Sequence, residues 1–131
     1  MSSGILIDSC LFIDHMRTKD KTNTHLAKIQ RLSADLYIST VVEYEVELGM
    51  TALHRELWNS ISEDLTILSF DSQMALMACE IKHGLKKKGI QTDVADLFVA
   101  ATAIVQELPL ATLNRKHFEQ IDGLRLLLPV S

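Results

Sequence analysis

Residues 93–118 read DVADLFVAATAIVQELPLATLNRKHF, and this stretch decides which fold we expect. Residues 94–107 predict a helix with apolar side chains around nearly its whole circumference, which is typical of a helix buried on most sides. Residues 108–112 then enter a strand. Two acids, Asp93 and Asp96, stand at the front of the helix, where an unpaired charge would be costly to bury. The rest of the chain must therefore supply both the layers that cover this helix and the groups that its acids face.

Short apolar runs alternate with helical patterns along the whole chain. This alternation predicts an α/β domain with a mostly parallel sheet of four to five strands and helices on both faces. Strands are expected at residues 5–7, 36–38, 65–70, 108–112 and 124–128. Helices are expected at residues 11–16, 25–32, 41–53, 57–61, 71–87 and 94–107, and Gly89 marks the end of the helix at 71–87.

The composition is that of an ordinary globular protein, with 47% hydrophobic and 23% charged residues. A length of 131 residues predicts one domain, residues 1–131, with a substantial core. Cys10 and Cys79 form no CxxC pair, which favours a reducing compartment over a disulfide framework or a cysteine zinc site. The N-terminus does not resemble a signal peptide, and the longest apolar run, residues 97–105, is too short to span a bilayer. We therefore expect a soluble, cytoplasmic protein.

The formal net charge of -4 argues against a protein that coats nucleic acid by bulk charge. Local basic patches remain as candidates for binding nucleic acid. The alternative for each patch taken alone is a solvated loop or helix end, and that alternative is preferred. The candidates are Arg17, Lys19 and Lys21 in one segment, Lys86, Lys87 and Lys88 in a second, and Arg115 and Lys116 in a third.

Three acids are predicted to lie at one edge of the sheet. Asp8 ends the first strand, and ligand sites of parallel sheets lie beyond the carboxyl ends of the strands. At 100° per residue, Glu45 falls within an apolar arc of its helix, whereas Glu43 and Glu47 point the opposite way, as on a solvated face. Asp96 follows Asp93, the expected N-cap, by three residues, so a weak capping box competes with a functional role for Asp96 but suffices for Asp93.

A buried carboxylate needs a cation, and a lone ion pair with Arg or Lys is the chief competitor of a metal. Hard oxygen ligands that leave several waters in place are what Mg²⁺ or Mn²⁺ prefers. One such ion would resolve the burial of Asp8, Glu45 and Asp96 together. The sequence therefore predicts an acidic metal site, with no indication of which acid, if any, serves as the general base.

Four motifs resemble, in order and spacing, those of the PIN-domain ribonucleases, most closely the VapC toxins of type II toxin–antitoxin pairs. They are ILIDSCLFID, ISTVVEYEVELG, DLFVAATA and LATLNRKHFEQIDGL, and they cover essentially the whole chain. The resemblance implies a three-layer α/β/α sandwich and a Mg²⁺- or Mn²⁺-dependent endoribonuclease that inhibits translation and leaves 5'-phosphate and 3'-hydroxyl ends. It also implies an RNA substrate, a VapB-like antitoxin that covers the pocket, and a toxin homodimer.

By position, the resemblance assigns the catalytic and metal-binding acids to Asp8, Glu45 and Asp96. Ser9, Thr112 and Asn114 match supporting polar residues of the family. His117 departs from the pattern, because many relatives carry a fourth acid there; it is expected either as a surface histidine or as a phosphate or metal contact. This change bears on whether a second metal binds and on how active the enzyme is.

Three rival interpretations follow from the same residues. The first is a PIN-like module that has lost cleavage through His117 and only binds RNA or a protein partner; the retention of all three acids argues against it. The second is an aspartyl phospho-acceptor domain, but the residues before Asp8 contain no acid. The third is nucleophilic attack by Cys10, which is disfavoured because no histidine is near in sequence and cysteine is often a small buried hydrophobe.

Overall fold

A computed structural model describes residues 4–33 and 35–127. Five parallel strands form one sheet in the order β3-β2-β1-β4-β5. The strands are β1 (Ile5–Ile7), β2 (Leu36–Ser39), β3 (Leu65–Leu68), β4 (Leu110–Ala111) and β5 (Leu126–Leu127). The expected α/β architecture and its parallel sheet are confirmed. The predicted strands at 65–70, 108–112 and 124–128 are shorter in the structure, and residue 128 lies outside the described residues.

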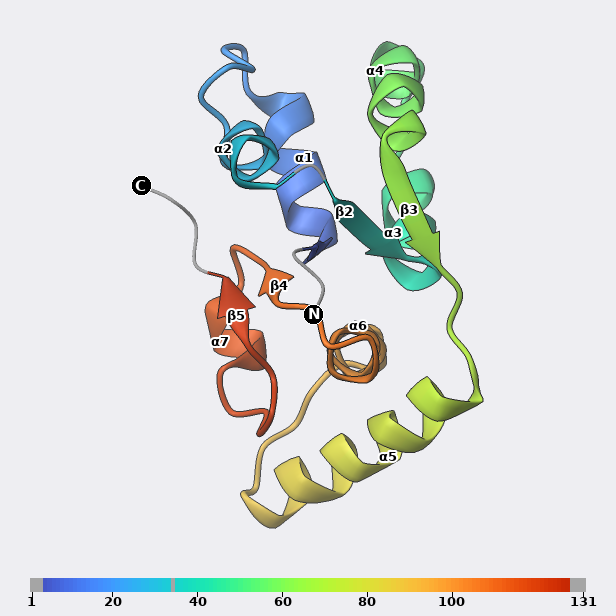
Figure 1. The fold of residues 1–131 in the computed structure, drawn as a ribbon, viewed down its shortest axis with the longest axis vertical. Coiled ribbons are helices and arrows are strands. Elements are labelled where there is room, and N and C mark those ends of the chain that lie inside the picture. The colour runs from blue at the N-terminus through green and yellow to red at the C-terminus, as the bar shows by residue number, and fades with distance from the viewer. Residues whose placement is uncertain (1–3, 34, 128–131) are drawn as a thin grey trace.

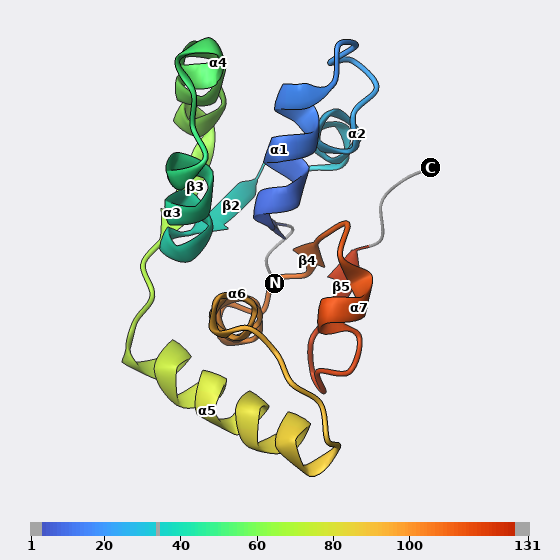
Figure 2. The same ribbon diagram turned by 180° about the vertical axis from the view of Figure 1, so that it is seen from behind.

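Seven helices connect the described strands: α1 (Ser9–Arg17), α2 (His25–Leu32), α3 (Thr40–Leu48), α4 (Ala52–Glu63), α5 (Ser72–Lys87), α6 (Val94–Val105) and α7 (Arg115–Phe118). In Figure 1, α1, α2 and α4 lie on one side of the strands, and α5 and α6 lie on the other. Turning the molecule by 180° shows the same layers from behind (Figure 2). The α/β/α sandwich expected from the resemblance is therefore present. None of the described helices combines the length and apolar character needed to cross a membrane.

The core lies between the sheet and its helices. Leu6, Ile7 and Leu110 are completely buried, as expected for central strands covered on both faces. Helix α6 is also buried along most of its length, including Leu97, Val99, Ala100, Ala101, Thr102 and Ala103. The prediction of a helix enclosed on nearly all sides is therefore confirmed.

The predicted single helix at 41–53 is wrong, because the chain forms two helices there. α3 ends at Leu48 with Gly49 as its C-cap, whose N–H donates to the carbonyl of Glu47, and α4 begins after Thr51. A single helix over 41–53 would place Leu48 and Leu53 on the apolar arc around Glu45, yet they are 72% and 84% exposed. The apolar spacing in the sequence runs across this helix boundary, because Leu48 and Leu53 fit the spacing although they face solvent.

Strand order reverses at β1, since the chain moves from β1 to β2 on one side and returns to β4 on the other. In open parallel sheets such a point, beyond the carboxyl ends of the strands, is where ligand sites form. Asp8 directly follows β1 and Thr112 directly follows β4. The fold therefore brings together two polar residues that lie more than one hundred positions apart.

Candidate active site

Asp8 is held in place by groups from both neighbouring strand ends. Its side chain is only 4% exposed, and its N–H donates to the carbonyl of Ala111 at 3.0 Å. The Asp8 carboxylate accepts hydrogen bonds from the N–H of Ser9 at 2.9 Å and from the hydroxyl of Thr112 at 2.8 Å. Hydrogen bonds to a charged acceptor are about twice as strong as neutral ones, so this network fixes the carboxylate at the edge of the sheet.

Glu45 extends from α3 toward the same edge. Burial raises the pKa of the Glu45 carboxyl, and the negative charges of Asp8 and Asp96 raise it further, whereas a hydrogen bond from Ser9 lowers it. Val42 and Val46, its neighbours on the helix, are buried. The prediction that Glu45 faces inward is confirmed, although the apolar arc around it is narrower than expected.

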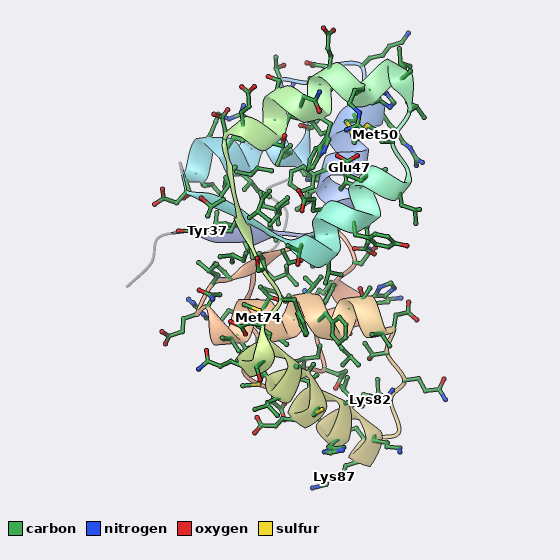
Figure 3. The ribbon with its side chains drawn as sticks, turned by 90° about the vertical axis from the view of Figure 1, so that its right-hand side faces the viewer. Tyr37, Glu47, Met50, Met74, Lys82 and Lys87 are labelled. Atoms are coloured by element: carbon green, nitrogen blue, oxygen red, sulfur yellow. The ribbon has the colours of Figure 1, made fainter. Side chains whose placement is uncertain are left out.

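Glu47 is exposed, as predicted, but it also has partners within the protein. Its carboxylate accepts two hydrogen bonds from the Arg55 guanidinium, at 2.7 and 3.0 Å, and one from the indole N–H of Trp58 at 3.0 Å. Figure 3 shows Glu47 beside α4, where these partners lie. Glu47 therefore links α3 to α4 and does not face the acidic edge of the sheet.

Asp96 lies in the first turn of α6 with its side chain 20% exposed. Burial raises the pKa of its carboxyl, and the charges of Asp8 and Asp93 add to that increase. His117 opposes it, because the Nδ1 atom of His117 lies 3.2 Å from Oδ2 of Asp96. His117 is exposed, as expected of a surface histidine, and it also contacts an acid of the site.

Asp93 occupies the N-cap position of α6, as predicted, but its side chain makes no capping hydrogen bond. The expectation that capping explains Asp93 is therefore wrong. Asp93 is exposed; its charge raises the pKa of Asp96, and it lines the cavity beside that residue.

We call Asp8, Glu45 and Asp96 the acidic centre, since they come from three elements and act on one another electrostatically. Within residues 4–33 and 35–127, no three His, Cys, Asp or Glu side chains are gathered closely enough to enclose a metal ion by themselves. The acidic centre is thus a set of neighbouring carboxylates rather than a complete ligand shell.

Cys10 supports Asp8, a role that local sequence patterns did not reveal. Its thiol lies 3.6 Å from Oδ2 of Asp8, to which it donates, and its sulfur accepts the N–H of Leu113 at 3.3 Å. Burial, followed by the charge of Asp8, raises the pKa of the Cys10 thiol to about 11. The thiol is therefore protonated at neutral pH, which argues against Cys10 as a nucleophile.

The remaining predicted site residues are a polar residue near Asp8, Asn114, and the basic residues of α5 and α7. Asn114 is exposed, but its N–H donates to the Thr112 hydroxyl at 3.0 Å, so it belongs to the network around Asp8. Arg115 forms an ion pair with Glu119 at 3.3 Å. Lys86 and Lys116 line a cavity beside Asp96, and Lys82, which sequence reasoning did not select, lines it as well.

Comparison with known families agrees with this geometry. The family model that describes the PIN domain matches residues 5–124. The chain belongs to the PIN-domain family. The PIN-domain fold and the predicted resemblance to VapC proteins are confirmed.

Two relatives align with almost the whole of this PIN-domain chain. Ribonuclease VapC1 of Methanocaldococcus jannaschii is 30% identical over 126 residues, which cover 95% of this chain and 87% of the relative. Ribonuclease VapC10 of Mycobacterium tuberculosis is 31% identical over 122 residues, covering 92% and 90%. The match to the PIN-domain family model, over residues 5–124, includes every element that contributes to the acidic centre.

Solved structures show the same PIN-domain architecture. The crystal structure of FitAcB from Neisseria gonorrhoeae contains a chain that superposes with a TM-score of 0.80 at 27% identity, covering 94% of this chain and 96% of that chain. DNA-bound VapBC from Salmonella typhimurium gives a TM-score of 0.81 at 23% identity, covering 97% and 98%, and supports the fold alone.

Proposed function

We propose that this PIN-domain protein is a Mg²⁺- or Mn²⁺-dependent endoribonuclease and the toxin of a type II toxin–antitoxin pair. Hydrolysis of RNA phosphodiester bonds would inhibit translation and growth. The observation that carries the proposal is the acidic centre at the switch point of the sheet, where Asp8, Glu45 and Asp96 interact. Relatives that align with more than nine-tenths of the chain are named ribonucleases.

The residues fit a hard divalent cation. Mg²⁺ is usually held by one or two carboxylates and keeps several waters, so it does not need three protein ligands in direct contact. Asp8, Glu45 and Asp96 offer oxygen donors, and the raised pKa values of Glu45 and Asp96 arise partly from the charge of neighbouring acids. A cation at the acidic centre would relieve that repulsion.

When bound, such an ion lowers the pKa of a coordinated water and neutralises charge on the phosphodiester. The protein's own side chains position the acids. Thr112 and Ser9 fix the Asp8 carboxylate through hydrogen bonds, and Ser9 orients Glu45. One carboxylate of the acidic centre would accept the proton of the attacking water.

We propose a VapB-like antitoxin, an RNA substrate and a homodimeric toxin in the cytoplasm as the biological setting. The proposed antitoxin rests on likeness of fold, since solved structures with this fold include DNA-bound VapBC from Salmonella typhimurium. The alternative is a catalytically weakened PIN-like module that binds RNA or a protein partner without cleaving. His117, in place of an acid and in contact with Asp96, is the observation behind that alternative.

An RNA cleavage assay on purified, antitoxin-free protein tests the proposal. We expect cleavage with Mg²⁺ or Mn²⁺ and none with a chelator or with Asp96→Asn. Asp64→Asn is the matched control, because Asp64 is exposed and precedes β3 at the opposite edge of the sheet. Equal activity of wild type and Asp96→Asn, or cleavage that persists in chelator, would refute the proposed mechanism. A folded protein that binds RNA without cutting would favour the alternative.

A further inference from the structure

A cavity of about 550 Å³ lies directly beside the acidic centre. Its walls come from the C-terminal part of α5, the loop between α5 and α6, the start of α6, and α7. Figures 1 and 2 both show that loop passing between the end of α5 and α6. Asp96, one of the three acids of the acidic centre, belongs to the lining, together with His117, which contacts it. We call it the α5–α7 groove.

Three lysines line the α5–α7 groove, although the protein as a whole is acidic. Lys82 and Lys86 are four residues apart on α5 and so share one face of that helix, and Lys116 comes from α7. All three are exposed, and none of them takes part in an ion pair within residues 4–33 and 35–127. Asp93 and Asp96 line the groove as well, but none of the three lysines forms an ion pair with either acid, so the lysine charges are free to meet an anionic ligand.

The run of three lysines at 86–88 is divided by the structure. Lys86 lines the groove. Lys87 is exposed at the end of α5 and points away from the body of the protein, whereas Lys82 extends on the side of the loop before α6 (Figure 3). Lys88 donates to the carbonyl of Gln120 at 2.8 Å and pairs with Asp122 at 3.2 Å, which ties the end of α5 to the segment after α7. Of this run, therefore, only Lys86 faces the groove, and Lys88 joins two of the segments that form its walls.

The groove also carries neutral groups suited to the other parts of a nucleotide. Gln91, Thr92 and Gln120 provide amides and a hydroxyl, and Ile90 offers an apolar surface. A volume of about 550 Å³ lies within the range of pockets that enclose a drug-sized molecule, roughly 300–1,000 Å³. Unpaired RNA can splay its bases into such a space, whereas the bases of a duplex stay stacked in pairs.

We propose that the α5–α7 groove binds the single-stranded RNA backbone next to the scissile bond, with Lys82, Lys86 and Lys116 contacting phosphates. The inference rests on the proposed ribonuclease function and adds the path of the substrate. The acidic centre repels phosphates that lie outside the reacting position, so a flanking strand needs cations close by. The groove supplies them on the side of α5 and α7, and Lys87 and Lys88 take no part.

Salt-dependent binding of a fluorescein-labelled 12-nucleotide single-stranded RNA of mixed sequence, in chelator, tests the groove. The test variant is Lys82→Gln with Lys86→Gln; the control, Lys19→Gln with Lys87→Gln, removes the same charge from exposed positions outside the groove. Each phosphate contact on a single strand contributes about 0.7 to the slope of log K against log salt. We expect the groove variant to lose about 1.4 from the slope, equivalent to roughly 25-fold weaker binding at 0.1 M salt. The control should keep the wild-type slope and affinity.

Cleavage kinetics distinguish failure of the groove from failure of the proposed function. With Mg²⁺ or Mn²⁺, the groove variant should show a raised KM and an unchanged kcat, because it loses binding that ground state and transition state share. Wild-type cleavage with equal KM in groove and control variants would overturn the groove proposal and leave the ribonuclease intact. Equal loss of affinity in both variants would also overturn it, since bulk charge alone would explain the binding. If the wild type neither cleaves nor binds RNA, the proposed function fails and the groove proposal fails with it.

Discussion

Replacing Thr112 by valine should show how strongly the two strand ends are joined. Thr112 is 2% exposed, and its hydroxyl donates to Asp8 at 2.8 Å while it accepts the N–H of Asn114 at 3.0 Å. A hydrogen bond to a charged group contributes about 1.5–3 kcal/mol to stability. With an unfolding entropy of about 2.1 cal/mol/K per residue, or about 275 cal/mol/K for the whole chain, this loss corresponds to a melting temperature lower by roughly 5–11 °C.

A double-mutant cycle separates this bond from the general effect of altering a buried site. Thermal unfolding, followed by circular dichroism in chelator, should be measured for Thr112→Val, Asp8→Ala and the double variant. If the bond carries the effect, Thr112→Val should cost much less in the Asp8→Ala background, with a coupling energy of about 1.5–3 kcal/mol. A coupling energy below about 0.5 kcal/mol would refute the view that Thr112 anchors the Asp8 carboxylate.

Three further outcomes follow from the site. Glu45→Gln should abolish metal-dependent RNA cleavage while Glu47→Gln preserves it, because only Glu45 interacts with the other acids of the acidic centre; equal loss in both would contradict this assignment. In chelator at pH 7, Glu45→Gln and Asp96→Asn should each raise the melting temperature. The pKa values of both carboxyls are raised in the folded state, so the folded state binds their protons more tightly than the unfolded state does. Ionisation of these two groups therefore destabilises the fold as pH rises. The gain in melting temperature should shrink as pH falls toward the ordinary carboxyl pKa of about 4. A gain that grows as pH falls would contradict this reasoning. Iodoacetamide should label Cys10 far more slowly than the exposed Cys79 at pH 7.5, since the pKa of Cys10 is about 11; equal rates would show that the Cys10 thiol is not protected.

Patterns that arise within one element were readable from the sequence. The alternation of strands and helices predicted the parallel sheet, and the apolar circumference of α6 predicted its burial. Asp8 was placed correctly at the strand edge, because a buried run that ends in an acid marks the end of a strand. The helical position of Glu45 also followed from 100° per residue. Each of these inferences uses only neighbours along the chain.

Features that depend on distant segments were not readable in this way. The contact between His117 and Asp96 joins α7 to α6, and the bond from Lys88 to Asp122 spans 34 positions. The contact between Lys88 and Asp122 explains why Lys88 does not face the groove as Lys86 does, although the two lysines look alike in the sequence. The break between α3 and α4 was missed for a different reason: Leu48 is exposed, and an apolar letter alone does not tell a surface leucine from a buried one.

The placement of β1 between β2 and β4 has a consequence for the order of events during synthesis. Asp8 is made early, yet Thr112, its hydrogen-bond partner, is 104 positions further along the chain. Pairing over such a separation must overcome a large loop-closure entropy and is slow to form. The ribosome must therefore synthesise the chain through Thr112 before the hydrogen bond that fixes Asp8 can form.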